Sequence, residues 1–134
     1  MKNLKIVLLF SFIPFIAFYS FKPVNQQKTE IEGIWIFDSY ENGHYVYKKA
    51  EQFDPKKQGI AFKENGELIK RQNAGWCGTP PISYSNFEGK WKWTAEDTIL
   101  IEYKYWGGVA NAKLKVVSLD DQTFKFLWLN LEKE

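Results

Sequence analysis

Hydrophobic and polar residues alternate along most of the second half of the chain. Between Phe87 and Leu131, four runs place apolar side chains at every second position, and short turns at 94–97, 107–108 and 120–122 separate them. A period of two is typical of a strand with one buried face and one solvated face. Turns this short connect antiparallel neighbours, so the pattern predicts a four-stranded β-meander.

The first half of the domain predicts four further strands. Two Asn-Gly pairs, Asn42-Gly43 and Asn65-Gly66, separate alternating segments and are typical of tight hairpin turns. The predicted strands cover residues 31–38, 44–48, 59–63 and 67–71. No window of a dozen residues keeps a helical period. We therefore expect an all-β fold, an up-and-down meander of about eight antiparallel strands closing into a small barrel.

The amino-terminal segment has a different pattern. Lys2 and Lys5 precede an apolar run from Ile6 to Phe21, which is typical of a secretory signal and short for a membrane-spanning helix. This predicts export to the periplasm or the medium, with an uncleaved anchor in the inner membrane as the alternative. The expected divisions are a signal peptide or anchor, a polar linker and a barrel domain at 1–21, 22–30 and 31–134.

Charge and composition exclude several classes of function. Lys2 and Lys5 supply the whole excess of basic residues, so the rest of the chain is neutral and binding to nucleic acid through a basic field is not expected. One histidine, His44, and one cysteine, Cys77, do not make a metal site or a catalytic pair. No phosphate loop or nucleophile motif is present, and the adjacent carboxylates fall in turns. We expect a non-enzymatic protein without a cofactor.

Aromatic residues on the strands are the main candidates for a binding site. Barrels of this size hold either packed side chains or one small ligand, so the aromatic residues either fill the core or line a pocket for an apolar or amphipathic molecule. Arg71, the only arginine, pairs either with a ligand carboxylate or with a glutamate on a neighbouring strand. The candidate ligand-binding residues are Trp91, Trp93, Tyr103, Tyr105, Phe124, Phe126 and Arg71.

The segment from Asn73 to Tyr84 is the long irregular part of the domain. Its two prolines and two glycines exclude a central strand, so it forms a plug, a lid or a contact loop at one end of the barrel. Its candidate contact residues are Trp76, Cys77 and Tyr84. We expect Cys77 to be a buried structural thiol, with reactivity towards a partner as the alternative. A protein-interaction or inhibitor module with a filled core, anchored by exposed Trp76 and Trp106, is the second hypothesis for function.

Two Gly-x-Trp motifs, Gly33-Ile34-Trp35 and Gly89-Lys90-Trp91, accompany the Asn-Gly hairpins and the export signal. Over about Ile31 to Asn130 the chain resembles the lipocalin superfamily, and in particular the small lipocalin-like domains of exported proteins from Bacteroidetes-type bacteria. The resemblance implies that Trp35 closes the bottom of the barrel against a basic side chain of the last strand, for which Lys125 is the candidate. It also implies binding or carriage of a small apolar molecule.

Overall fold

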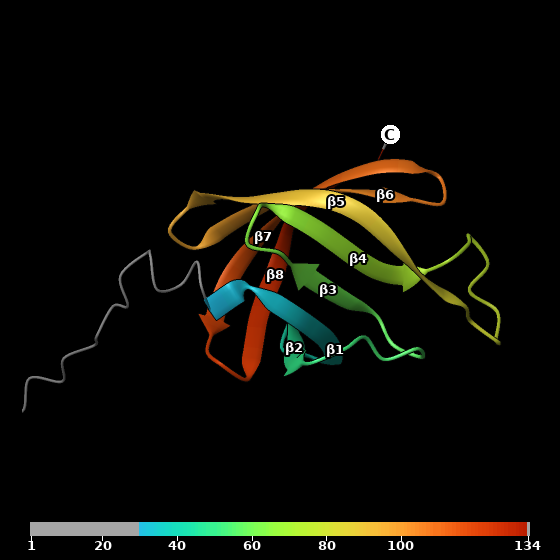
Figure 1. Cartoon of the computed structure of the whole chain (residues 1–134), viewed down its shortest axis with the longest axis horizontal. Coiled ribbons are helices and arrows are strands. Elements are labelled where there is room, and N and C mark those ends of the chain that lie inside the picture. The colour runs from blue at the N-terminus through green and yellow to red at the C-terminus, as the bar shows by residue number, and fades with distance from the viewer. Residues whose placement is uncertain (1–29, 134) are drawn as a thin grey trace, which may run out of the picture.

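Eight antiparallel strands close into a barrel, as the sequence pattern predicts (Figure 1). The computed structural model describes residues 30–133, so the expected signal segment and residues 22–29 of the linker lie outside the described residues. Within residues 30–133 there is no helix with the length and apolar character needed to cross a membrane. The strands are β1 (Gly33–Glu41), β2 (His44–Ala50), β3 (Gly59–Phe62), β4 (Glu67–Asn73), β5 (Tyr84–Ala95), β6 (Thr98–Tyr105), β7 (Gly108–Leu119) and β8 (Thr123–Lys133).

The order of strands around the barrel departs from a simple meander at one place. From β3 to β8 each strand pairs with the next one in sequence. The strand β3, however, pairs with β1, and β2 closes the barrel against β8. The expectation that every strand lies beside its successor was therefore wrong between β2 and β3. The alternation of side chains defines the inner face of a strand, but it does not determine which edge of the first hairpin receives β3.

The connection from β2 to β3, residues 51–58, is held to the barrel by Arg71. The Arg71 Nε donates to the Asp54 carbonyl oxygen at 3.1 Å, and Nη2 donates to the Pro55 carbonyl oxygen at 3.1 Å. Its Nη1 donates to Asn86 Oδ1 at 2.8 Å on the neighbouring strand. The guanidinium thus binds two backbone carbonyls of a loop and an asparagine, and these partners take the place of the neighbouring-strand glutamate considered from the sequence.

We expect Arg71→Met to lower the free energy of unfolding by about 1–2 kcal/mol, because partly exposed hydrogen bonds of this kind contribute modestly. The loop at residues 51–58 should also become more sensitive to limited proteolysis. Urea denaturation and a protease time course measure the two effects. Lys104→Met, at an exposed position on β6, is the control. Wild-type stability and an unchanged cleavage rate in Arg71→Met would contradict this role.

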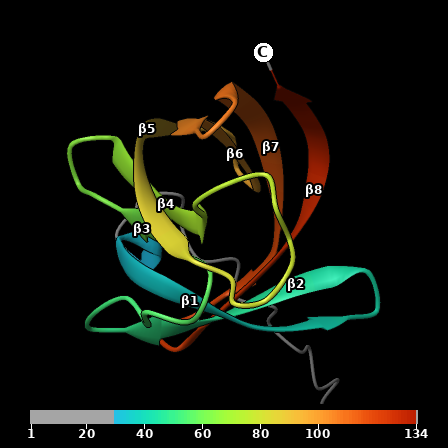
Figure 2. The same ribbon diagram turned by 90° about the vertical axis from the view of Figure 1, so that its right-hand side faces the viewer.

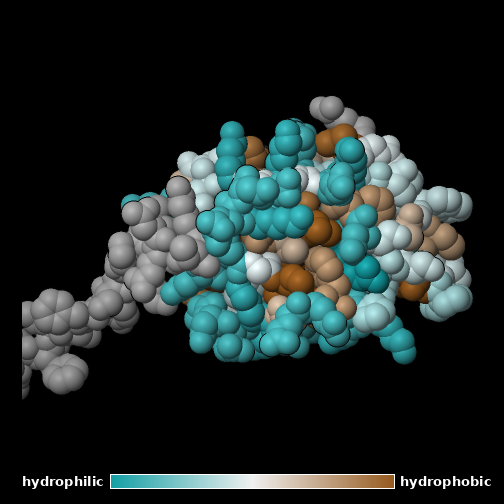
Figure 3. All heavy atoms as spheres, viewed as in Figure 1, coloured by the Kyte–Doolittle hydropathy of each residue, from teal (hydrophilic) through white to brown (hydrophobic). Residues whose placement is uncertain are grey.

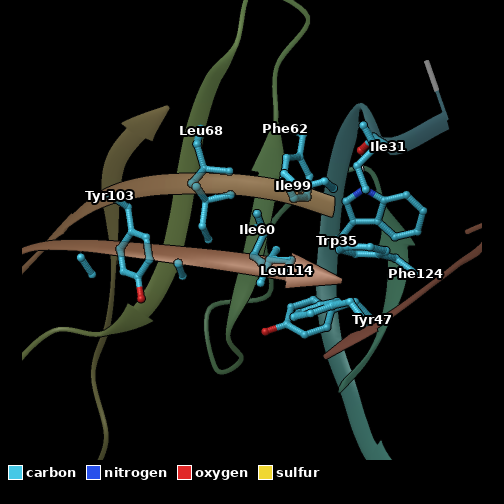
Figure 4. Packing of buried hydrophobic residues seen from close by; sticks show 14 residues of the cluster. Ile31, Trp35, Tyr47, Ile60, Phe62, Leu68, Ile99, Tyr103, Leu114 and Phe124 are labelled. Atoms are coloured by element: carbon cyan, nitrogen blue, oxygen red, sulfur yellow. Dashed lines mark hydrogen bonds between the residues drawn. The ribbon is translucent and has the colours of Figure 1, made fainter. Parts of the chain in front are cut away.

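Trp35 fills the closed end of the barrel. Its side chain is fully buried, its Nε1 donates to the Ile31 carbonyl oxygen at 2.6 Å, and its ring lies 5.6 Å from that of Phe124 between centroids (Figure 4). The nearby cation is Lys49, whose Nζ lies 4.4 Å from the Trp35 ring centroid and donates to the Glu32 carbonyl oxygen. A closing tryptophan under a basic side chain is therefore present in this barrel.

The prediction that Lys125 is the basic residue over Trp35 was wrong. Lys49 lies directly opposite Trp35 in the pairing of β1 with β2. Lys125 lies between Phe124 and Phe126, whose side chains are fully buried in the barrel, so alternation directs Lys125 to the outer face. Lys49 lies beside Trp35 because the pairing register of β1 with β2 places these two residues opposite each other.

Both Gly-x-Trp glycines occupy places where a side chain would obstruct the fold. A Cβ on Gly33, whose φ is +116°, would lie 2.8 Å from Lys49 Nζ, so the missing side chain leaves room for that lysine. A Cβ on Gly89 would collide with the carbonyl oxygen of Glu102 on β6. The close approach of β5 to β6 therefore requires glycine there.

Candidate functional site

The end of the barrel opposite Trp35 holds an open cavity of about 620 Å³, which we call the cup. Inward side chains near the ends of β2, β4, β6 and β8 form its wall, and Gly75 and Trp76 of the connection after β4 reach its rim. Figure 2 shows this connection crossing the end of the strand ring. The aromatic lining residues are Tyr45, Tyr47, Trp76, Tyr103, Tyr105, Trp106 and Trp128. The polar lining residues are Gln58, Lys70, Gln72 and Asn73.

Lys70 is the one charged side chain among the described residues that line the cup. It is 3% exposed, and its cross-strand neighbours Ile60 and Phe87 are apolar. Its Nζ lies 6.0 Å from the Tyr47 ring centroid, and within residues 30–133 it has no hydrogen bond or ion pair. Burial lowers the pKa of Lys70 from 10.5 to about 8 because the charged form loses solvation.

Tyr47 and Tyr103, which line the cup with Lys70, stay protonated at neutral pH. Burial raises the pKa of Tyr47, and the neighbouring Tyr45 and Tyr103 add to the effect. Burial also raises the pKa of Tyr103, with a further contribution from Tyr105. Neutral phenols both donate and accept hydrogen bonds. The cup therefore combines flat apolar walls, neutral hydroxyl groups and one buried amine.

The structure brings together only part of the predicted ligand-binding set. Of this set, Tyr103 and Tyr105 line the cup, where they meet Trp76 from the predicted contact loop. Phe124 and Phe126 are fully buried and stacked with 4.6 Å between ring centroids, so they belong to the packed core. Phe126 also packs against Tyr45 and Tyr47 at 5.7 and 5.3 Å and so supports the cup wall from inside the core.

Trp91 and Trp93 lie outside the lining of the cup. Trp91 packs edge-on against Phe62 at 5.2 Å, and its Nε1 donates to the Lys63 carbonyl oxygen at 2.9 Å, beside the turn between β3 and β4. Trp93 is partly buried against the core. Both residues face inward as their alternation predicts, but they are further along β5 towards the closed end. Alternation assigns a side chain to a face of a strand and leaves its depth in the barrel undetermined.

Sequence reasoning missed Tyr45, Tyr47 and Lys70 as parts of the site. The sequence did contain a signal for Lys70. This lysine lies two residues after Leu68, so strand alternation places both residues on the same, buried face of β4. A lysine at an inward strand position is unusual, since lysine is rarely buried without a partner. Tyr45 and Tyr47 were harder to identify as site residues because they lie on a short strand beside the first Asn-Gly turn.

The connection of residues 74–83 borders the cup, and Asn73 orders its start. Asn73 Oδ1 accepts from the Gly75 amide and its Nδ2 donates to the Cys77 carbonyl oxygen, both at 3.1 Å. Trp76 is 80% exposed at the rim. Tyr84 begins β5 opposite Asn73 and is half-buried outside the lining.

Cys77 is exposed, so the expectation of a buried structural thiol was wrong. The reason is that the connection passes over the end of the barrel and its short side chains do not reach the core. The Cys77 thiol contacts the Thr79 hydroxyl at 3.2 Å, and hydrogen bonding to Thr79 holds the pKa of Cys77 below its usual value.

A second hollow, of about 490 Å³, lies on the outer wall over β4, β5 and β6. Lysine and glutamate side chains of both signs alternate around it, including Glu67, Lys90 and Glu102. Figure 3 shows that the face over β3, β4 and β5 is largely hydrophilic around a hydrophobic centre. Its exposed, balanced charges suit a solvated surface better than a binding pocket. In residues 30–133 no group of three or more His, Cys, Asp or Glu side chains is placed to hold a metal ion.

Comparisons of this chain with protein-family models, with curated proteins and with solved structures found no match.

Proposed function

We propose that the protein is an exported, non-enzymatic binding protein that takes a small apolar or amphipathic ligand into the cup. The observation that supports this function most is that the two halves of the barrel differ in packing. The half around Trp35 and Phe124 is packed, whereas the other half holds an open cavity of about 620 Å³ lined mainly by aromatic side chains. Sites for small molecules typically have volumes of about 300–1,000 Å³ and mostly apolar walls with a few polar groups.

A second function, a protein-interaction or inhibitor module, has one observation in its favour. Trp76 and Trp106 are 80% and 53% exposed at the rim of the cup, and exposed tryptophans are frequent anchors of interfaces. The two functions use the same end of the barrel. They differ in whether the cup itself is occupied by a small molecule.

The test uses N-phenyl-1-naphthylamine, a neutral apolar dye that fluoresces when it leaves water. The protein is recovered from a bacterial host without denaturation, and solvent extraction followed by mass spectrometry identifies any molecule that travels with it. We expect saturable binding of one dye per protein. Trp128→Ala should weaken this binding at least about tenfold, because the dye loses an aromatic wall.

Trp93→Ala is the matched control, since Trp93 is also a partly buried tryptophan beside the core but lies outside the cup. Its affinity for the dye should stay within about twofold of wild type, and a thermal melt checks that each variant is folded. Absence of saturable dye binding to the wild-type protein, with no extractable small molecule, would refute the binding function and favour the interaction module.

A further inference from the structure

We propose that the ligand is an anionic amphiphile, with one carboxylate or phosphate group on an apolar body, and that it enters head first so that the anion contacts Lys70 inside the cup. This inference rests on the proposed binding function and adds the charge of the ligand and its orientation. The geometry that carries it is a buried, unpartnered ammonium group at the inner surface of an aromatic cup.

The position of Lys70 is poorly explained by packing. It follows Leu68 on the inner face of β4, and its cross-strand neighbours are Ile60 and Phe87. An apolar side chain of similar length would satisfy these contacts without the desolvation of a charge. The lysine therefore lowers the stability of the empty protein, and an anion that arrives with the ligand would offset that cost.

No carboxylate of the described residues neutralises Lys70 within the cup. The lining contains no aspartate or glutamate, and Glu67, Glu88 and Glu102 are exposed on the outer faces of their strands. The other hydrogen-bonding side chains of the lining include the phenols and the side-chain amides of Gln58 and Gln72. These groups can all donate to an anion, and donors around a cation strengthen the binding of a carboxylate or phosphate.

The apolar body of the ligand has a separate place along the same axis. Trp76 and Trp106 stand at the solvent-exposed rim, and Tyr105 and Trp128 lie half-buried on the wall. A head-first ligand would place its apolar body between these rings while its anion reaches Lys70. The opposite orientation would bury an apolar end against an unpaired ammonium group, which is unfavourable.

The charge of Lys70 changes around pH 8. Burial lowers the pKa of Lys70 to about 8. Tyr45 and Tyr47 of β2 and Tyr103 and Tyr105 of β6 line the cup together with Lys70, whereas its cross-strand neighbours on β3 and β5 are apolar. Burial raises the pKa values of Tyr47 and Tyr103 above their usual range. The affinity for an anion should therefore fall as the pH rises through about 8, while the affinity for a neutral ligand stays constant.

The experiment measures displacement of N-phenyl-1-naphthylamine by four probes with the same ten-carbon chain at pH 7. The probes are decanoate, decyl phosphate, decanol and decyltrimethylammonium. We expect at least one anion to bind about tenfold or more tightly than decanol, and the cation to bind most weakly. The ratio of the affinities for decanoate and decyl phosphate distinguishes a carboxylate site from a phosphate site.

Lys70→Met should remove the preference for the anions and leave the affinity for decanol within about twofold. Lys104→Met, which removes an exposed lysine of β6, should keep the full preference. An equal affinity of wild type for decanoate and decanol, or a preference that survives in Lys70→Met, would overturn the anionic inference and leave the binding function standing. Failure of the dye and of all four probes to bind would instead refute the binding function.

A wild-type pH series keeps the test decisive if Lys70→Met does not fold. Between pH 7 and pH 9.5 the preference for decanoate over decanol should shrink several-fold. A ratio that stays constant over this range would show that no group such as Lys70 recognises the anion, and would overturn the inference.

Discussion

Trp35→Ala is expected to lower the free energy of unfolding by about 4 kcal/mol, which is a large part of the stability of a domain of this size. The indole is fully buried, and truncation would leave a cavity at the closed end of the barrel. The change would also remove the hydrogen bond from Nε1 to the Ile31 carbonyl oxygen and the ring contact with Phe124. Urea denaturation followed by far-UV circular dichroism measures the loss.

Two variants separate the contributions at this position. Trp35→Phe retains most of the apolar volume but loses the hydrogen bond and part of the ring surface under Lys49. We therefore expect it to lower the free energy of unfolding by about half as much as Trp35→Ala. Trp106→Ala removes a tryptophan that is 53% exposed, and its effect on stability should stay within about 0.5 kcal/mol. A loss below about 1 kcal/mol in Trp35→Ala would show that the closed end repacks, and would contradict the role assigned to Trp35.

Lys70→Met is expected to raise the free energy of unfolding at pH 7, by at most about 3.5 kcal/mol. The pKa of Lys70 is lowered from 10.5 to about 8, and each unit corresponds to about 1.4 kcal/mol. Water that enters the open cup solvates part of the ammonium group and reduces this gain. Methionine has a similar length and no charge, so it fits the same space without overpacking.

The pH dependence of this gain follows from the direction of the shift. Between pH 8 and pH 10.5 the unfolded chain holds the Lys70 proton and the folded chain has lost it, so raising the pH favours the folded state. Wild-type stability should therefore rise across this window, and the advantage of Lys70→Met should disappear by its upper end. Denaturant curves from pH 7 to pH 10.5 test this, with Lys104→Met as the exposed control. Parallel pH profiles for wild type and Lys70→Met would contradict the unpaired state of Lys70.

The two substitutions describe the two ends of the barrel. The closed end is optimised for packing, and any truncation there costs stability. The cup carries a charge that destabilises the empty protein, which is typical of functional sites where stability is lost to binding. An anionic ligand that binds Lys70 should therefore raise the melting temperature of the wild type more than that of Lys70→Met at the same ligand concentration.

The local sequence determined the strands, their faces and their tight turns. Alternation identifies Phe124, Phe126 and Tyr103 as inward residues, and the Asn-Gly pairs identify two hairpins, because these signals depend on neighbours within a few residues. Even the inward position of Lys70 follows from its spacing to Leu68. These features are set by backbone geometry and side-chain period, so they can be read along the chain.

Contacts between distant segments were decided only by the tertiary structure. The pairing of β3 with β1, the placement of Lys49 over Trp35 and the exposure of Cys77 depend on how the first hairpin and the connection at 74–83 meet the rest of the barrel. The depth of each inward residue depends on the register of all eight strands together. For that reason the sequence grouped Phe124 with Tyr103, whereas closure of the barrel packs Phe124 against Trp35 and leaves Tyr103 in the lining of the cup.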